Sequence, residues 1–152
     1  MTWASWVNHI HPLFPNITET NCSPTSTKSS AYNCIAWACG KDEAWFEPDA
    51  SNEYFWPIDD RSYTVAAYIK LFSSIGYNNC ADSSLETGFL KIALYIDKEG
   101  LPSHAARQIL TGKWTSKLGP DIDIEHDCPE VLNGPLYGEA RIFMKREKEP
   151  SY

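Results

Sequence analysis

The chain contains no run of apolar residues close to the roughly 20 that are needed to cross a bilayer, which argues against a membrane-spanning protein. It also has few basic residues: 13 lysines and arginines stand against 20 acidic residues, for a net charge of −7. This charge repels phosphate backbones, and the basic residues are scattered, so we expect no nucleic-acid partner. The N-terminal segment MTWASWVNHIHPLF lacks the basic start and the unbroken apolar stretch of a secretory signal. We therefore expect a cytoplasmic protein, although export by a signal-independent route would leave no such trace.

Closely spaced pairs of cysteine are missing as well. The five cysteines stand at positions 22, 34, 39, 80 and 128, too far apart for the CxxC pairs of a zinc site. An odd number of cysteines also does not fit a disulfide framework. We expect reduced thiols, no metal ion and no cofactor.

The sequence does contain enough apolar material for one core. Of its 152 residues, 43% are hydrophobic and 13% aromatic, which excludes a disordered chain. At this length roughly two thirds of the unfolded surface can be buried without a metal or disulfide. We expect a single domain over residues 1–152, with an irregular N-terminal arm (1–29) and a frayed tail (147–152).

The periodicity of the remaining chain predicts an α+β fold. SAYNCIAWACG (30–40) fits a short helix capped by Asn33 or Ser30, and RSYTVAAYIKLFSSIGY (61–77) fits a longer helix capped by Ser62 or Thr64. Three apolar runs separated by turns then predict an antiparallel β meander, and a last strand follows Tyr137 and Gly138. These four runs are FLKIALYI (89–96), HAARQIL (104–110), KWTSKL (113–118) and GEARIFMKR (138–146).

An aromatic-rich stretch between the two helices has neither helical nor strand periodicity. Residues 45–57 carry five aromatic side chains among acidic residues and prolines. Loops of this length within a small domain are usually functional or mobile. The loop is either a lid over the core or a wall that contacts a ligand, and the sequence leaves both interpretations open.

Cys34 is the first candidate for chemistry because it stands in the first turn of the predicted helix, where the helix N-terminus favours a thiolate. A catalytic thiol also needs a base, and the chain has four histidines. His104 is best placed, since it opens a strand that can face a helix packed across the sheet. The structural alternatives are that Cys34 is a buried apolar residue, that His104 is bonded to a backbone carbonyl and that His126 lies on the surface.

The order of a cysteine at a helix N-terminus, a β meander whose second strand begins with histidine, and a later polar residue resembles the papain-like cysteine hydrolases, particularly the NlpC/P60 and CHAP types. The segments YNCIAWACG, HAARQILTGKWTSKLG, DIEH and YG more closely resemble a family of small bacterial proteins known only as a domain of unknown function. The first resemblance implies a papain-like fold in which the helix that bears the cysteine packs on the sheet.

The papain-like resemblance also implies catalytic roles. Cys34 would be the nucleophile and His104 the general base, with His126, Asp123 or Ser116 orienting the imidazole. The backbone N–H of Cys34 and a side chain of Asn33 or Tyr32 would hold the oxyanion. Further candidate substrate contacts are Trp37, Trp114, Ser116 and Lys117.

Two functions follow. The first is a thiol-dependent hydrolase of an amide or peptide bond, acting through an acyl-enzyme on Cys34 with a peptidoglycan peptide, an isopeptide or a side-chain amide as substrate. The second is a non-catalytic bacterial binding or immunity-type protein that uses loop 45–57 as its contact surface. The hydrolase requires the Cys34 thiol to lie within about 4 Å of a His104 ring nitrogen.

Overall fold

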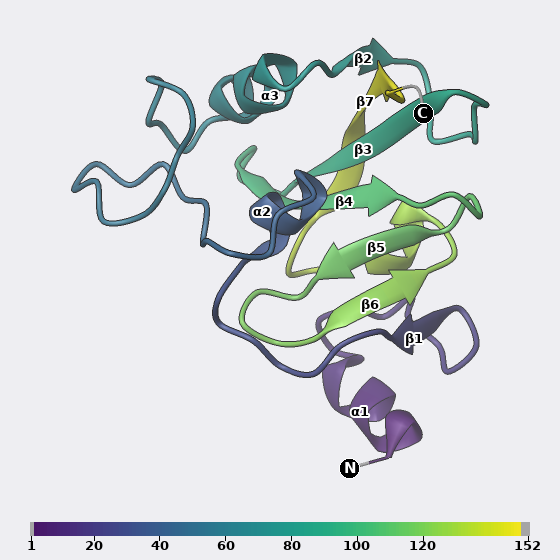
Figure 1. Cartoon of the computed structure of the whole chain (residues 1–152). Helices are drawn as coiled ribbons and strands as arrows, with labels where there is room; N and C mark the ends of the chain where they lie inside the picture. Colours follow the sequence, from purple (N-terminus) through teal and green to yellow (C-terminus); the bar gives the residue numbers. More distant parts are fainter. Residues whose placement is uncertain (1, 150–152) are drawn as a thin grey trace.

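A seven-stranded antiparallel sheet forms the centre of the protein (Figure 1). The computed structural model describes residues 2–149. The strand order is β1-β6-β5-β4-β3-β7-β2, and the helices make the class α+β, as expected. The helices are α1 (Trp3–Ile10), α2 (Cys34–Ala38), α3 (Val65–Ser74) and the 3₁₀ helix η1 (Pro129–Leu132). The strands are β1 (Cys22–Pro24), β2 (Asn78–Cys80), β3 (Phe89–Ile96), β4 (Pro102–Gln108), β5 (Trp114–Lys117), β6 (Asp123–His126) and β7 (Glu139–Glu147).

The predicted meander is present and is longer than expected. Strands β3, β4, β5 and β6 follow one another as antiparallel neighbours, so β6 adds a fourth strand to the three that the sequence predicted. Strand β7 pairs with β3 on the far side of the meander. Each run therefore became a strand because its β-branched, aromatic and small residues pack on a pleated surface.

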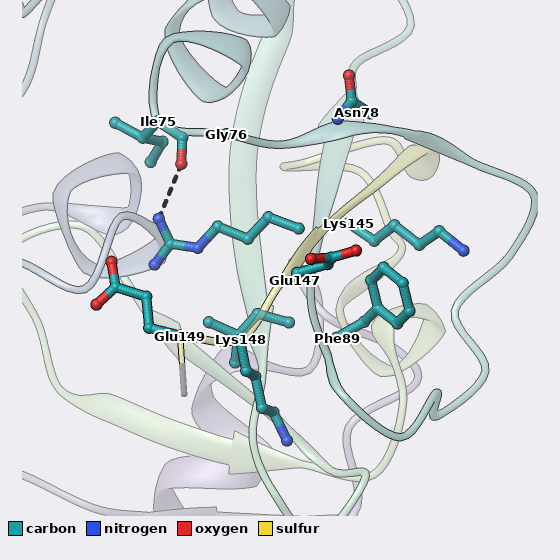
Figure 2. Close-up of a pocket in the computed structure, with 10 residues that line it drawn as sticks. Ile75, Gly76, Asn78, Phe89, Lys145, Glu147, Lys148 and Glu149 are labelled. Carbon is teal, nitrogen blue, oxygen red and sulfur yellow. Dashed lines mark hydrogen bonds between the residues drawn. The ribbon is translucent and has the colours of Figure 1, made fainter. Parts of the chain in front are cut away.

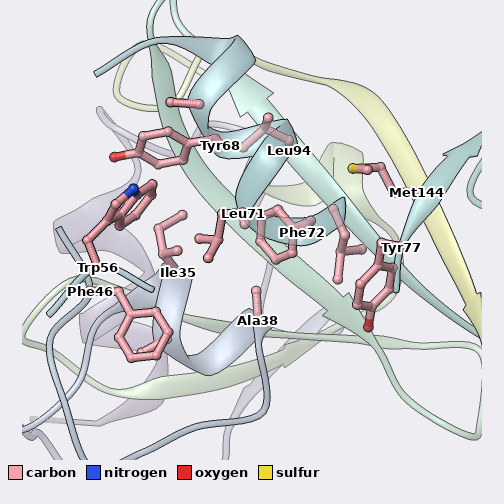
Figure 3. Close-up of a cluster of buried hydrophobic side chains, with 14 of the residues drawn as sticks. Ile35, Ala38, Phe46, Trp56, Tyr68, Leu71, Phe72, Tyr77, Leu94 and Met144 are labelled. Atoms are coloured by element: carbon pink, nitrogen blue, oxygen red, sulfur yellow. The ribbon is translucent and has the colours of Figure 1, made fainter. Parts of the chain in front are cut away.

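Both faces of the sheet are buried, and alternate residues of β3 show this clearly. Ile92 and Leu94 point into a first core with α2, α3 and the loop after α2, which Figure 3 shows. Ala93 and Tyr95 point into a second core, which α1 and η1 help to form. Strand parity therefore decides which core, and which helices, any side chain of the sheet can reach.

Helix α3 shows why the predicted helices formed. Its buried residues recur every three or four positions, and they face the first core. The Thr64 side chain caps the helix by accepting from the Ala67 N–H, as the sequence predicted. These buried residues are Ala67, Tyr68, Leu71 and Phe72. None of the described helices is both long and apolar enough to cross a bilayer.

The irregular arm was a wrong prediction, because it contains α1 and β1. Trp3, Trp6, Val7 and Ile10 have the spacing of one helical face, and Thr2 caps the helix by accepting from the Ser5 N–H. Two prolines shortly after the helix, at positions 12 and 15, hid this pattern. Met1 and residues 150–152 of the predicted tail lie outside the described residues.

Candidate functional site

Asn33 fixes the start of α2. Its Oδ1 accepts from the N–H of Ala36 (3.2 Å) and of Phe46 (3.0 Å), and its Nδ2 donates to the Phe46 carbonyl (2.8 Å). One buried amide thus caps the helix and ties it to the loop. Cys34 is the first residue of α2, so its predicted place in the first turn is confirmed.

The Cys34 thiol is held in its neutral form. Burial raises the pKa of the thiol to about 11, although the backbone N–H groups of Ala105 and Ile35 and the charge of Lys117 act to lower it. A nucleophilic cysteine needs the opposite balance, with a pKa near or below the ambient pH. At neutral pH the Cys34 thiol is therefore protonated in this structure.

His104, Ser116 and His126 form a buried hydrogen-bonded chain across β4, β5 and β6. His104 Nε2 lies 3.0 Å from Ser116 Oγ, which lies 2.8 Å from His126 Nε2. His126 Nδ1 lies 2.9 Å from the Cys128 carbonyl, which can only accept. We therefore assign the proton of His126 to Nδ1, and Ser116 then donates to His126 Nε2 and accepts from His104 Nε2–H.

This assignment leaves His104 Nδ1 with a free lone pair, and this atom is buried with no hydrogen-bond partner. Burial lowers the pKa of His104 well below its ordinary value, with His126 adding to the effect, and burial lowers the pKa of His126 to about 4. Both rings are therefore neutral at pH 7. Of the three residues considered as partners of His104, Ser116 is the one whose side chain hydrogen-bonds to its ring.

The described part of the chain forms no hydrogen bond between Cys34 and His104, so the dyad that the sequence predicted stays a prediction. Ala105 lies in the first core, against which Cys34 packs. His104 is the next residue along β4 and points to the opposite face, where its ring packs on Tyr95 and Tyr137 of the second core. No hydrogen bond joins the thiol to the ring among the described residues.

The YG segment packs against the histidine. The Tyr137 ring stacks on the His104 ring, with centroids 4.2 Å apart and planes within 8°. Gly138 has a φ of +73°, and a Cβ placed there would lie 2.1 Å from the Ile96 carbonyl oxygen. Only glycine therefore permits the approach of this turn to β3 that places Tyr137 over His104.

The polar candidates on the face of the sheet that α2 covers form hydrogen bonds between separate segments of the chain. The Tyr32 hydroxyl donates to Asp123 Oδ2 (2.7 Å), so Asp123 is separated from His104 by the sheet. Lys117 Nζ lies 4.8 Å from the centre of the Tyr32 ring and donates to the Ser29 and Gly119 carbonyls, each at 2.6 Å. These bonds occupy the ammonium group that was a candidate for substrate binding.

The two tryptophan candidates are also structural. Trp37 Nε1 donates to Thr115 Oγ1 (2.9 Å), and the Arg107 guanidinium lies 5.2 Å from the centre of its ring. Trp114 is buried in the second core. None of the candidate residues lines any of the five principal cavities in residues 2–149.

One of these cavities brings together four segments that the sequence did not connect. Its volume is about 310 Å³. Loop 45–57 supplies one wall, and α3, the segment after α2, and β7 supply the rest. The lining residues are Cys39, Lys41, Phe46, Phe55, Pro57, Leu71, Ile75 and Arg146. The aromatic loop was the only signal of this site, because the other segments meet only in the folded chain.

Comparisons with known proteins identify a family but no activity. A family model described as "Domain of unknown function (DUF7689)" matches residues 23–145. No curated protein and no solved structure matches the chain. The closer of the two resemblances, to a domain of unknown function, is thereby confirmed, whereas the likeness to NlpC/P60 and CHAP enzymes and the bacterial origin gain no support.

Proposed function

Because the chain belongs to a family of unknown function, DUF7689, which supplies no activity, we propose from the geometry that it is a non-catalytic binding protein whose contact surface is loop 45–57. The observation that carries this proposal is a rigidly built loop that leaves aromatic side chains in solvent. The partner we expect is a peptide or a protein.

The loop is ordered by its own hydrogen bonds. The Asp49 carboxylate accepts from the Glu53 N–H (2.7 Å) and the Tyr54 N–H (3.2 Å). Arg61 bonds to both the Asp49 carboxylate (3.1 Å) and the Tyr54 carbonyl (2.9 Å), which ties the loop to the start of α3. At its base the Glu47 N–H donates to the Phe55 carbonyl (3.0 Å). Such preorganisation reduces the entropy that binding would otherwise cost.

The side chains that this framework presents are the types that dominate binding energy at interfaces. Tyr54, Phe55 and the nearby Tyr63 are 42%, 53% and 46% exposed. Aromatic residues bury much apolar area with few rotatable bonds, and tyrosine adds a hydroxyl for the rim of an interface. The surface that the loop presents therefore suits a partner better than it suits solvent.

A photo-crosslinking amino acid at position 55 tests the contact surface. We expect it to join the full-length protein to one defined partner in cells, identified by mass spectrometry. The matched control is the same amino acid at Leu110, which is 75% exposed in the turn between β4 and β5. Equal recovery of the same proteins from both positions would refute the loop as the binding surface.

A thiol-dependent hydrolase of papain-like architecture is the second candidate, and the unpartnered His104 Nδ1 favours it. A buried acceptor without a partner is costly and is often retained for chemistry. The backbone N–H groups of Ala105 and Ile35 and the charge of Lys117 favour the Cys34 thiolate, although burial outweighs them. Catalysis would require the Cys34 thiol to approach the free His104 Nδ1.

Alkylation separates the two candidates. For the hydrolase, iodoacetamide at pH 7 should modify Cys34 faster than the other four thiols, and His104→Ala should abolish this preference. If iodoacetamide labels Cys34 at the same rate in the native protein and in His104→Ala, the hydrolase is excluded and the binding function remains. The exposed His9→Ala serves as the control variant.

A further inference from the structure

The cavity beside loop 45–57 contains positive charge that has no counterion. Lys41 and Arg146 line it, and Arg107 lies close behind, since all three charges act on the pKa of Cys39. Within residues 2–149, no carboxylate oxygen lies within 4 Å of any of these three cations. In a chain with a net charge of −7, such a group of unpaired cations is an exception that needs a reason.

The two guanidinium groups are fixed but not neutralised. Arg146 donates to the Ile75 carbonyl (2.9 Å), the dashed line in Figure 2, and lies 5.0 Å from the centre of the Tyr77 ring. Arg107 donates through Nε to the Trp37 carbonyl (3.2 Å). Burial lowers the pKa of Arg107 and the charge of Arg146 adds to this, whereas the Asp123 carboxylate acts in the opposite direction. Each side chain thus has donors that remain free for an anion, in a fork geometry that matches a carboxylate.

The rest of the lining is apolar. Phe46 and Phe55 pack on each other, with ring centroids 4.9 Å apart, and form the loop side of the cavity. Leu71 of α3 and Ile75, the residue that follows the helix, add to the apolar lining. The volume of about 310 Å³ is at the lower end for ligand sites, enough for one large side chain and its carboxylate. A second groove continues past the shared residues Ile75 and Arg146 along β7 (Figure 2).

We propose that this cavity binds the C-terminal residue of a peptide, with an apolar side chain between Phe55 and Ile75 and the terminal carboxylate at Arg146 and Lys41. This inference rests on the proposed function, because it names what the partner places beside loop 45–57. A chain end supplies an apolar group and a carboxylate on one residue, which is the combination that the lining offers. The neighbouring groove gives the preceding residues of the peptide a path away from the cavity.

The test uses the full chain and a matched pair of peptides, acetyl-Gly-Gly-Phe as the free acid and as the C-terminal amide. In an NMR titration we expect the acid to bind at least about tenfold tighter than the amide, because a charge-assisted hydrogen bond is lost in the amide. The backbone N–H signals of Cys39, Lys41 and Ile75 of the protein should shift on addition of the free-acid peptide. Equal affinities for acid and amide, or shifts elsewhere only, would overturn the proposal.

Two variants check the role of the cations. Lys41→Gln, at an exposed position, should weaken binding of the free-acid peptide several-fold and leave binding of the amidated peptide unchanged. Arg146→Gln should weaken binding of the free-acid peptide further. Lys98→Gln, at an exposed lysine in the turn after β3, is the control and should change nothing. If neither peptide binds while crosslinking from position 55 still captures one partner, the cavity proposal fails and the binding function stands. If crosslinking fails as well, the proposed function fails with it.

Discussion

The buried histidines should make the protein unstable in mild acid. Burial lowers the pKa of both His104 and His126, so the folded protein keeps both rings neutral at pH 5. The unfolded chain protonates them below its ordinary pKa of about 6.5 and therefore binds more protons than the folded state. The free energy of unfolding is then highest above pH 6.5 and is lost as the pH falls towards the folded values, about 4 for His126.

The size of this effect follows from the same values. Between pH 7.5 and pH 5.0 His126 should cost about 2 kcal/mol of stability, and His104 should add a loss in the same direction. Carboxylates with lowered pKa values, such as Asp60 and Glu86, lose their contribution at lower pH, so pH 5.0 is the useful end of the range.

Urea denaturation at the two pH values measures the loss directly. In His126→Gln the pH dependence should be smaller but should not vanish, because the buried His104 ring is still present. Nitrogen-15 NMR should also show His104 protonated at Nε2 and His126 at Nδ1. A loss of stability below about 1 kcal/mol, or imidazolium signals from either ring at pH 5.0, would refute the assignment of two neutral buried rings.

Two further predictions concern stability. Gly138→Ala should lower the free energy of unfolding by more than about 3 kcal/mol in urea denaturation, because the position combines a positive φ with a Cβ that would overlap the Ile96 carbonyl. Gly100→Ala, with open space around its Cβ, should lower the free energy of unfolding clearly less. Similar losses in the two variants would contradict the steric reason. Asn33→Ala should cost about 2–4 kcal/mol, since it removes a helix cap and leaves both Phe46 backbone groups unpaired. Asn33→Asp keeps the acceptor and should cost less in the same assay; equal costs would show that the cap itself contributes little.

Local patterns carried most of the fold prediction. Helix α3 and strand β3 have enough length and periodicity to be read from their own residues. The two helix starts could be narrowed to two candidate caps each, because a cap is a contact between near neighbours, and the structure selects Asn33 over Ser30 and Thr64 over Ser62. Helix α1 was missed because the prolines after it dominated the interpretation of a short segment.

The candidate site could be predicted only in part, and strand parity explains why. His104, Ala105 and Ala106 are all buried, so β4 shows no alternation of polar and apolar residues from which its facing could be inferred. A shift of one position separates a histidine that faces α2 from one that faces the second core. The cavity beside loop 45–57 could not be predicted, because its cations come from segments about 100 residues apart and meet only through tertiary packing.

The lengths of the outermost strands have a consequence for self-association. The sheet ends on β1 and β2, each only three residues long, and Pro24 in β1 has no backbone N–H to offer. Another chain can add to a sheet only where a row of backbone donors and acceptors is free. The free backbone donors and acceptors of β1 and β2 are too few to pair with a strand of another molecule. The sheet edges therefore disfavour the growth of fibrils.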